Sequence, residues 1–402
     1  MMLSDAGSPG LRAADVCDYR QVVRKALVPF DTATVSRWES ARHVPTSAIA
    51  CLARAGVFRA RWENGAERGL PHLVVFSEEM FRCSSGLAEC AMGHSEMFTG
   101  ALTWLASDPW HHELLEMSLD GRAVGCFAAT ELHGGSDLAA IKTKAERSSA
   151  GWRIDGSKRY ITNIGSATHV LVLARDSKSS AANDLSLFIV PTDVPGVSID
   201  GFFDMVGLQE CDVGQASFHV DLPGSALLGR RGLGLLYVTH LLQFERLSIC
   251  AQLIAAAESA LDLAVAYARG RETAGVRIMD RQTIRHRLAF CQAELWNLES
   301  RISDLVERAS RTGHMPAHEI AALKLTAGDG VGRIVDICMQ VFGARGSSRN
   351  FPLEKLWRDA RLARLGGGAD EVLADMVGSY LDRPDEDINR ILQRAIAHDD
   401  PC

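Results

Sequence analysis

The sequence predicts an α+β protein in which a helical domain, a β domain and a second helical domain follow one another. Residues 1–120 carry apolar side chains at loosely helical spacing. Residues 121–228 change to short runs rich in β-branched and aromatic residues, separated by Gly and Pro turns. From residue 229 to residue 402 the helical period returns in long Ala- and Leu-rich segments. We therefore expect an N-terminal helical bundle, a middle antiparallel β-barrel or sandwich, and a C-terminal helical bundle.

The first 120 residues are expected to form several helices. Residues 19–41 form the first, and Ser47 is a plausible N-cap of the second. A helix is expected over residues 71–98, and Pro109 is expected to break the segment 102–119, because proline interrupts the hydrogen-bond ladder of a helix.

The rest of the chain divides into strands and then helices. The expected strands cover residues 126–129, 152–154, 157–161, 169–174, 186–190, 197–200 and 215–220. The expected helices cover residues 235–268, 281–312, 317–343 and 369–381. The glycine-rich stretch 229–234 is read as an interdomain linker in preference to a phosphate loop. A Rossmann nicotinamide site is disfavoured, because no strand leads into G-x-G-x-x-G with an acidic residue downstream.

Composition narrows the functional class. The net charge of −7 over 402 residues gives no basic footprint for nucleic acid. The ten cysteines contain no C-x-x-C pair and the histidines form no ligand constellation, so neither a metal site nor a disulfide framework is expected, and a reducing cytoplasm fits best. We expect no signal peptide and no membrane span, since no run approaches the ~20 apolar residues that a span needs.

Residues 127–137, FAATELHGGSD, carry the first chemical signal. A strand that ends in small residues allows a flat ring to lie against the main chain, where backbone amides and the Thr130 hydroxyl can donate to ring heteroatoms. Gly134 and Gly135 allow a second ligand group to approach the backbone closely, because glycine has no Cβ. His133 lies in this turn and is expected to be exposed.

This stretch resembles the flavin-binding signature of the acyl-CoA dehydrogenase family, aromatic-x-x-T-E-x-x-x-G-S-D. Four further resemblances follow in order: residues 160–163 (YITN), 271–282, 340–346 and 358–360 (RDA). Together they span about residues 22–381. The resemblance implies the three-part fold of that family, with a flavin between the β domain and the C-terminal bundle.

The resemblance also implies FAD as the cofactor and assigns residues to it. It assigns Phe127, Ala129 and Thr130 to the edge of the isoalloxazine ring, Tyr160 and Thr162 to the wall on its far side, and Gly135 and Ser136 to the turn near the pyrophosphate. It assigns Arg271 and Gln282 to the pyrophosphate and adenine end of a flavin in a neighbouring subunit, and Gln340 and Gly343 to the partner side of that site. Ser136 and Arg246 are also assigned to the substrate side. Ala274 and Ala369 replace the family's usual Phe and Thr, so weaker FAD binding is expected.

The family reaction needs a carboxylate base, and the usual base position falls here on Gly367. Some family members place the base in a Glu-Arg pair on a helix, and this chain has Glu245-Arg246. We therefore predict Glu245 as the base, with Asp370 and Glu371 as rivals. The Gly367 amide is expected to donate to the thioester carbonyl, as an oxyanion site requires.

The sequence thus predicts FAD-dependent α,β-dehydrogenation of an acyl thioester carried on CoA or on acyl carrier protein. The alternatives are a flavin-dependent oxidase or monooxygenase on the same fold, and a catalytically degenerate FAD-binding protein. The resemblance further implies a dimeric or tetrameric homo-oligomer, with electron-transfer flavoprotein or oxygen as electron acceptor. The unusual His133 turn and the departures from the family pattern suggest a specialised member, as in secondary metabolism.

Overall fold

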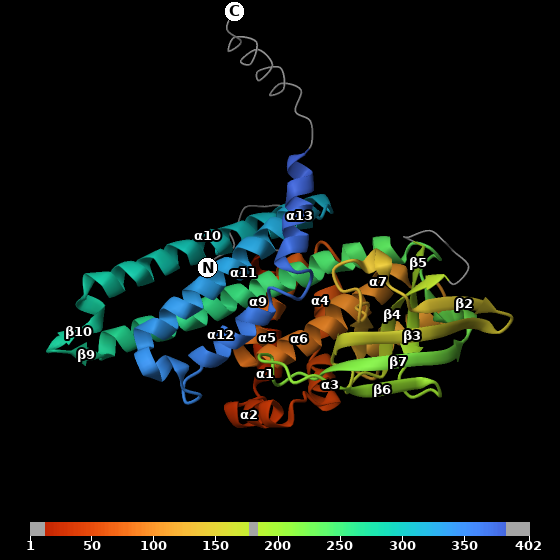
Figure 1. The fold of residues 1–402 in the computed structure, drawn as a ribbon, viewed down its shortest axis with the longest axis horizontal. Coiled ribbons are helices and arrows are strands. Elements are labelled where there is room, and N and C mark those ends of the chain that lie inside the picture. The colour runs from red at the N-terminus through yellow and green to blue at the C-terminus, as the bar shows by residue number, and fades with distance from the viewer. Residues whose placement is uncertain (1–12, 177–183, 383–402) are drawn as a thin grey trace, which may run out of the picture.

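The computed structural model describes residues 13–176 and 184–382. The helices occupy one side of the molecule and the sheet the other, and three long helices run side by side along the long axis (Figure 1). The helices before the sheet are α1 (Ala13–Leu27), α2 (Thr32–Ala41), α3 (Thr46–Arg54), α4 (Val57–Trp62), α5 (Leu70–Cys83), α6 (Ser85–Met92), a π-helix (Gly93–Thr99), α7 (Gly100–Leu105) and α8 (Pro109–Leu119).

The N-terminal expectations hold in outline and fail in detail. Residues 19–41 form two helices instead of one, and Asp31 caps the second by accepting a hydrogen bond from the Thr34 amide at 2.8 Å. Ser47 lies inside α3, whose N-cap is Pro45 and has no side-chain cap, so that prediction is wrong. Pro109 begins α8 and interrupts the helical segment, as expected.

The middle of the chain forms one sheet with strand order β6-β7-β3-β2-β4-β5-β8, and β1 also pairs with β4. Most neighbours are antiparallel, as expected, but β4 is parallel to both β1 and β2. The residues predicted as a turn between two strands lie within the single strand β3, and β2 was missed. The strands are β1 (Gly125–Ala128), β2 (Lys144–Ser148), β3 (Gly151–Thr162), β4 (His169–Asp176), β5 (Leu185–Pro191), β6 (Val197–Phe202), β7 (Val213–Leu222) and β8 (Leu227–Leu228).

The C-terminal part is helical, as predicted, and its long helices match the expected ranges within one or two residues. A short hairpin of β9 (Glu272–Thr273) and β10 (Val276–Arg277) separates the first two helices. The helix that carries the R-D-A residues, α12, was not predicted. The helices are α9 (Gly234–Gly270), α10 (Gln282–Thr312), α11 (Ala317–Phe342), α12 (Leu353–Leu362) and α13 (Asp370–Leu381).

Helix α9 is the central element, and its start is fixed against the sheet. Tyr237, Val238 and Leu241 share a buried core with Leu171 and Leu187 of the sheet. Further along, α9 packs against α5 and α11 within the helical core. By length and composition α9 is apolar enough to cross a membrane, which the sequence analysis missed, but 67% of its most apolar window is buried inside the protein, as in a core helix.

Candidate active site

Glu245 lies on α9 one turn beyond the residues that pack this helix against the sheet. Its side chain is half-buried and lies near the backbone amide of Gly367. Burial raises the pKa of Glu245, and the charges of Arg246 and Lys324, together with the Gly367 amide, offset part of that rise. A carboxylate that is ionised but poorly solvated is a strong base. The arrangement therefore suits removal of a weakly acidic proton.

The glycine run after α12 is held against α9 by two buried cations. The Arg246 Nε donates to the Gly367 carbonyl at 2.8 Å, and the Lys324 Nζ donates to the Gly368 carbonyl at 2.9 Å. Gly367 has φ +63°, a conformation that favours glycine, and a Cβ there would lie 3.2 Å from Ile249 Cδ1. The structure thus brings Glu245 and Gly367 together, and it gives Arg246 a positioning contact.

The rival carboxylates are engaged elsewhere or open to solvent. The Asp370 carboxylate accepts a hydrogen bond from the Arg364 Nε at 2.6 Å, and Glu371 is exposed. Both residues line a surface hollow beside Thr326 of α11. Their placement favours Glu245 as the base.

Sequence reasoning missed a second carboxyl group in the same region. Glu89 on α6 is half-buried and lies near the side chain of Gln252, which is two turns beyond Glu245 on α9. Burial, followed by the charge of Glu245, raises the pKa of Glu89 to about 8. The available signal was a single carboxyl group in an otherwise uncharged helix, Ser85–Met92.

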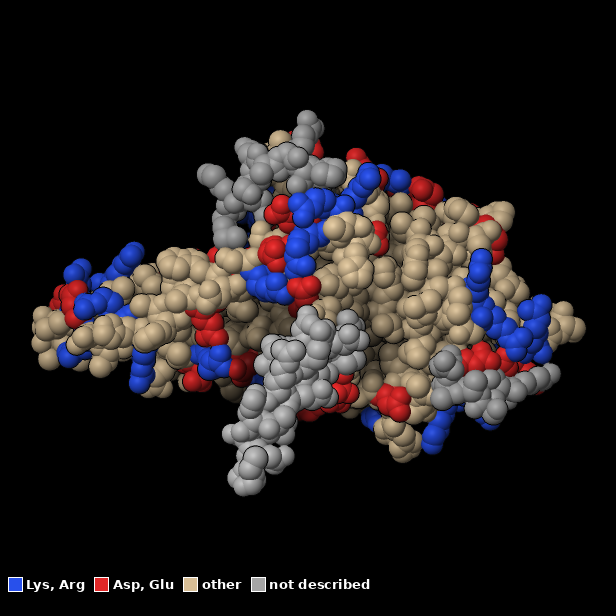
Figure 2. Space-filling view, turned by 90° about the horizontal axis from the view of Figure 1, so that it is seen from above, with Lys and Arg blue, Asp and Glu red and all other residues tan. Residues whose placement is uncertain are grey.

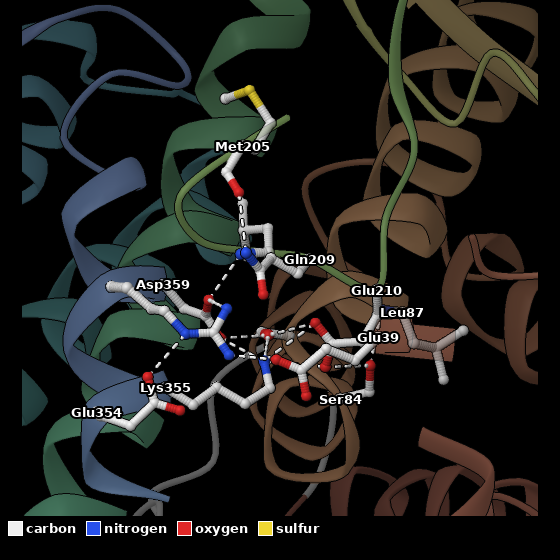
Figure 3. A network of polar contacts seen from close by, with 12 residues as sticks. Glu39, Ser84, Leu87, Met205, Gln209, Glu210, Glu354, Lys355 and Asp359 are labelled. Carbon is white, nitrogen blue, oxygen red and sulfur yellow. Dashed lines mark hydrogen bonds and ion pairs between the residues drawn. The ribbon is translucent and has the colours of Figure 1, made fainter. Parts of the chain in front are cut away.

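A network of polar contacts fixes α6 in place (Figure 3). The Lys355 Nζ of α12 donates to the Ser85 hydroxyl at 2.7 Å, to Glu210 at 3.0 Å and to Asp359 at 2.5 Å. Asp359 also accepts from the backbone amide of Leu208 at 2.6 Å. The two carboxylates outweigh the effect of burial and raise the pKa of Lys355.

Arg358 extends this network to α2. It contacts Glu354 at 3.0 Å and also pairs with Glu39 (Figure 3). We call Lys355, Arg358 and Asp359 with their partners the α12 clamp. The clamp joins α2, α6, the loop before β7 and α12, so the R-D-A residues act by holding parts of the fold together.

The strand predicted to contact the flavin edge ends beside β3. The Arg159 amide donates to the Thr130 carbonyl at 2.9 Å. Glu131 accepts from the amides of Lys142 at 2.6 Å and Thr143 at 2.9 Å, and from the Lys158 ammonium at 2.8 Å. Glu131 therefore fixes the turn that follows Thr130.

The residues beside this turn fit a flavin. Within the described residues, the hydroxyls of Thr130 and Thr162 have no hydrogen-bond partner, so both are free to donate to a ligand. Tyr160 is 53% exposed, although its ring stacks on Phe203 at 4.5 Å. It also adopts φ +54°, an uncommon conformation for a non-glycine residue. An exposed aromatic ring beside two free hydroxyls is the surface that a planar, polar ring system would cover.

The remaining flavin-edge residues divide by exposure. Phe127 is half-buried on β1 and Ala129 is buried just after it, whereas Gly135, Ser136 and His133 are exposed in the turn. The expected exposure of His133 is thus confirmed. Among residues 13–176 and 184–382, no group of three or more His, Cys, Asp or Glu side chains has a metal-holding arrangement.

The other predicted cofactor residues lie at the opposite end of the molecule. Arg271 precedes the β9–β10 hairpin and Gln282 begins α10, and both are exposed far from the sheet (Figure 1). Gln340 and Gly343 close α11 at the same end, where Phe342 stacks on Tyr267 of α9 at 4.2 Å. Within this chain, these four residues therefore lie far from the strand that ends at Thr130.

This far end is basic. Figure 2 shows Lys and Arg side chains gathered there, around a few acidic ones. The exposed arginines of this segment are Arg269, Arg271, Arg277, Arg281, Arg285 and Arg287. Arg277 is paired with Asp280 at 2.8 Å, whereas Arg271 has no side-chain partner within the described part of the chain. Such a surface suits a diphosphate presented by another molecule.

The three-part fold, the carboxylate at Glu245 and the flavin-compatible strand ends define a flavoprotein of the acyl-thioester dehydrogenase type. The chain belongs to the acyl-CoA dehydrogenase family. The family's middle-domain model matches residues 126–220 and its C-terminal-domain model matches residues 232–381.

This chain is similar to known relatives and to solved structures over nearly its whole length. The chain is 30% identical to the acyl-(acyl-carrier-protein) dehydrogenase MbtN of Mycolicibacterium paratuberculosis over 91% of its length and 94% of the relative's. It is 29% identical to MbtN of Mycobacterium sp. strain MCS, covering 92% and 94%. The crystal structure of an acyl-CoA dehydrogenase from Geobacillus kaustophilus superposes with TM-score 0.87 at 25% identity, covering 94% of this chain and all of that one.

These findings confirm the predicted fold, the dehydrogenase class and FAD as the cofactor. They do not favour the oxidase, monooxygenase or degenerate alternatives. FAD, when bound, supplies the acceptor for a hydride leaving the β-carbon of the acyl group.

Proposed function

We propose that this protein dehydrogenates the α,β-bond of an acyl group held as a thioester on acyl carrier protein, with Glu245 as the base. The observation that carries the proposal is the poorly solvated Glu245 carboxylate between Arg246, Lys324 and the Gly367 amide. Two relatives that span more than nine tenths of the chain are named acyl-(acyl-carrier-protein) dehydrogenases, which supports the carrier.

In this proposal, two groups act on opposite ends of one enolate. The Gly367 amide donates to the thioester carbonyl oxygen, where negative charge develops, and the Glu245 carboxylate takes the α-proton. The Gly367 amide lowers the pKa of Glu245. When this amide donates to the carbonyl oxygen, it acts less on the carboxylate, which then becomes a stronger base.

The cofactor site is proposed to be shared between copies of the chain. Thr130, Tyr160 and Thr162 would hold the flavin ring, and Arg271 and Gln282 of a second copy would reach its diphosphate and adenine end. The separation of the two sets in one chain (Figure 1) supports this arrangement. An arginine fork matches the geometry of a diphosphate.

The test is anaerobic reduction of the bound flavin, which is monitored through the loss of the flavin's visible absorbance. Matched acyl groups are presented on acyl carrier protein and on CoA to the wild type, to Glu245→Gln and to Glu371→Gln. We expect carrier-protein thioesters to reduce the wild-type flavin, Glu245→Gln to stay oxidised, and Glu371→Gln to behave as wild type.

Each part of the proposal has its own contrary result. Faster reduction by CoA thioesters would overturn the carrier assignment and leave the base in place. Normal reduction in Glu245→Gln would exclude Glu245 and return the search to Asp370 and Glu371. Flavin that stays oxidised with every thioester would contradict the proposed reaction.

A further inference from the structure

Glu89 stands out because nothing in the proposed reaction uses it. It is the one charged residue of α6, an eight-residue helix that is otherwise small and apolar. Its side chain is half-buried, and α6 packs against α9, where the Gln252 amide lies near it. Burying a carboxyl group beside an apolar helix is costly unless hydrogen bonds compensate. One amide donor leaves most of the hydrogen-bonding capacity of this carboxyl group available.

A polar strip connects Glu89 to the proposed base. Glu245, Ser248 and Gln252 recur along α9 at helical spacing, so they share one face of that helix. The Gln252 side chain lies 3.4 Å from the Ser248 hydroxyl, which contacts the Ser77 hydroxyl at 2.7 Å. Seven residues of helix correspond to about 10 Å, so the strip extends roughly that far from the base.

The charges around Glu89 come from three neighbouring elements. Glu245 of α9 and Asp359 of α12 raise its pKa, and Lys324 of α11 lowers it. Burial and the charges of Glu245 and Asp359 favour the protonated form of Glu89, whereas the charges of Arg246 and Lys324 offset part of the effect of burial on Glu245. The two carboxyl groups are thereby suited to different tasks, one as a neutral hydrogen-bonding group and the other as a base.

We propose that Glu89, together with Gln252, is a specificity-determining residue that hydrogen-bonds to an uncharged polar substituent, such as a hydroxyl, on the acyl chain of the substrate. The substrate class is then a hydroxylated acyl thioester and not a plain hydrocarbon one. This inference rests on the proposed function, because it places the acyl chain along α9 from Glu245. A negatively charged substituent is disfavoured, since Glu245 and Asp359 already act on this position.

The test compares paired substrates in matched variants. A series of ω-hydroxyacyl thioesters of increasing length, each paired with the unsubstituted acyl thioester of that length, is offered to the wild type, Glu89→Gln and Glu89→Leu. Flavin reduction gives the relative rates. Calorimetric titration into Glu245→Gln, alone and combined with each Glu89 variant, gives the dissociation constants without turnover. Glu113→Leu, which removes an exposed carboxylate from α8, is the control.

We expect the wild type and Glu113→Leu to prefer the hydroxylated member by about tenfold at one chain length, in line with the net value of a buried hydrogen bond. Glu89→Gln should keep the preference, since an amide also donates and accepts. Glu89→Leu should lose or reverse it. An unchanged ratio in Glu89→Leu, or a wild-type preference for the unsubstituted chain at every length, would overturn the inference.

The two failures can be told apart. If no thioester reduces the flavin but the hydroxylated one still binds more tightly to Glu245→Gln, the proposed reaction fails and the role of Glu89 stands. If plain and hydroxylated thioesters reduce the flavin equally in every variant, the reaction stands and the role of Glu89 fails.

Discussion

The region around Glu245 and the tip around Arg271 are built in opposite ways. At Glu245, groups from α6, α9, α11 and the loop after α12 converge, and the side chains are buried or half-buried with partners inside the same chain. At the β9–β10 tip, Arg271 and Gln282 are exposed, and the large sheet, which carries Tyr160 and Thr162, lies at the other end of the molecule (Figure 1).

This contrast separates what one chain completes from what it leaves open. Buried charges are retained only with partners, so the base region is already assembled before any ligand arrives. An exposed arginine loses little by having no partner in water, and it gains when a diphosphate is brought to it. We therefore expect changes at Glu245 to affect chemistry, and changes at Arg271 to affect cofactor retention.

The largest expected effect tests the base region directly. Glu245→Gln removes the proton acceptor and keeps the shape of the side chain. Flavin reduction by the preferred thioester should slow by about 10²–10⁴-fold, the usual contribution of a general base. Stopped-flow absorbance measures the rate, and Glu371→Gln is the control. A loss below tenfold would show that another group takes the proton.

The next effect tests what holds the base region together. Lys355→Met removes the cation that pairs with both buried carboxylates of the α12 clamp, Glu210 and Asp359. Removing one partner of such a buried pair costs about 3–5 kcal/mol, so the midpoint of thermal unfolding should fall clearly. The matched control is Lys25→Met on α1, because Lys25 is exposed and has no ion pair within the described part of the chain. Equal midpoints in Lys355→Met and Lys25→Met would contradict the clamp.

A smaller effect is expected at the open end. Arg271→Ala should weaken FAD binding by about tenfold to a hundredfold, the value of one charge-assisted contact. The rate of reduction per bound flavin should not change, because the base region is untouched. Reconstitution titrations measure the binding, and Arg269→Ala is the neighbouring control. If both variants bind FAD like the wild type, Arg271 does not reach the diphosphate.

The smallest effect is a shift in pH dependence. The charge of Lys324 lowers the pKa of Glu245, so Lys324→Met should raise that pKa. Because the base acts when deprotonated, the rise of the flavin-reduction rate with pH should move to higher pH. At high pH the variant should approach the wild-type rate. A profile that moves to lower pH would show that Lys324 does not act on Glu245 in this way.

The sequence predicted the parts of the site that depend on local pattern. Thr130, Tyr160 and Thr162 are predicted as flavin residues because the strand-and-turn motif is continuous in the chain. Glu245 is predicted as the base because the usual base position holds Gly367, and the structure places the two residues near each other. Ser47 failed as a cap because α3 begins at Thr46, after Pro45, whose fixed extended backbone has no side-chain cap.

Other parts of the site could not be predicted, because they are relations between distant residues. The sequence of α6 alone gives Glu89 no role, because its neighbours Gln252 and Glu245 are distant in the chain. Helix α12 was not predicted, and the contacts of its Lys355, Arg358 and Asp359 with three other elements join residues that are distant in the chain.

The sequence by itself determined the order of helical, β and helical parts, the bounds of the long helices, and the flavin and base motifs, since periodicity and turn chemistry act over a few residues. Only the tertiary structure decided that Gly367 meets Glu245, that a second carboxyl group lies along the same face of α9, and that Arg271 is far from Thr130. Those facts depend on which surfaces pack together, and packing is set by contacts between residues that are distant in the chain.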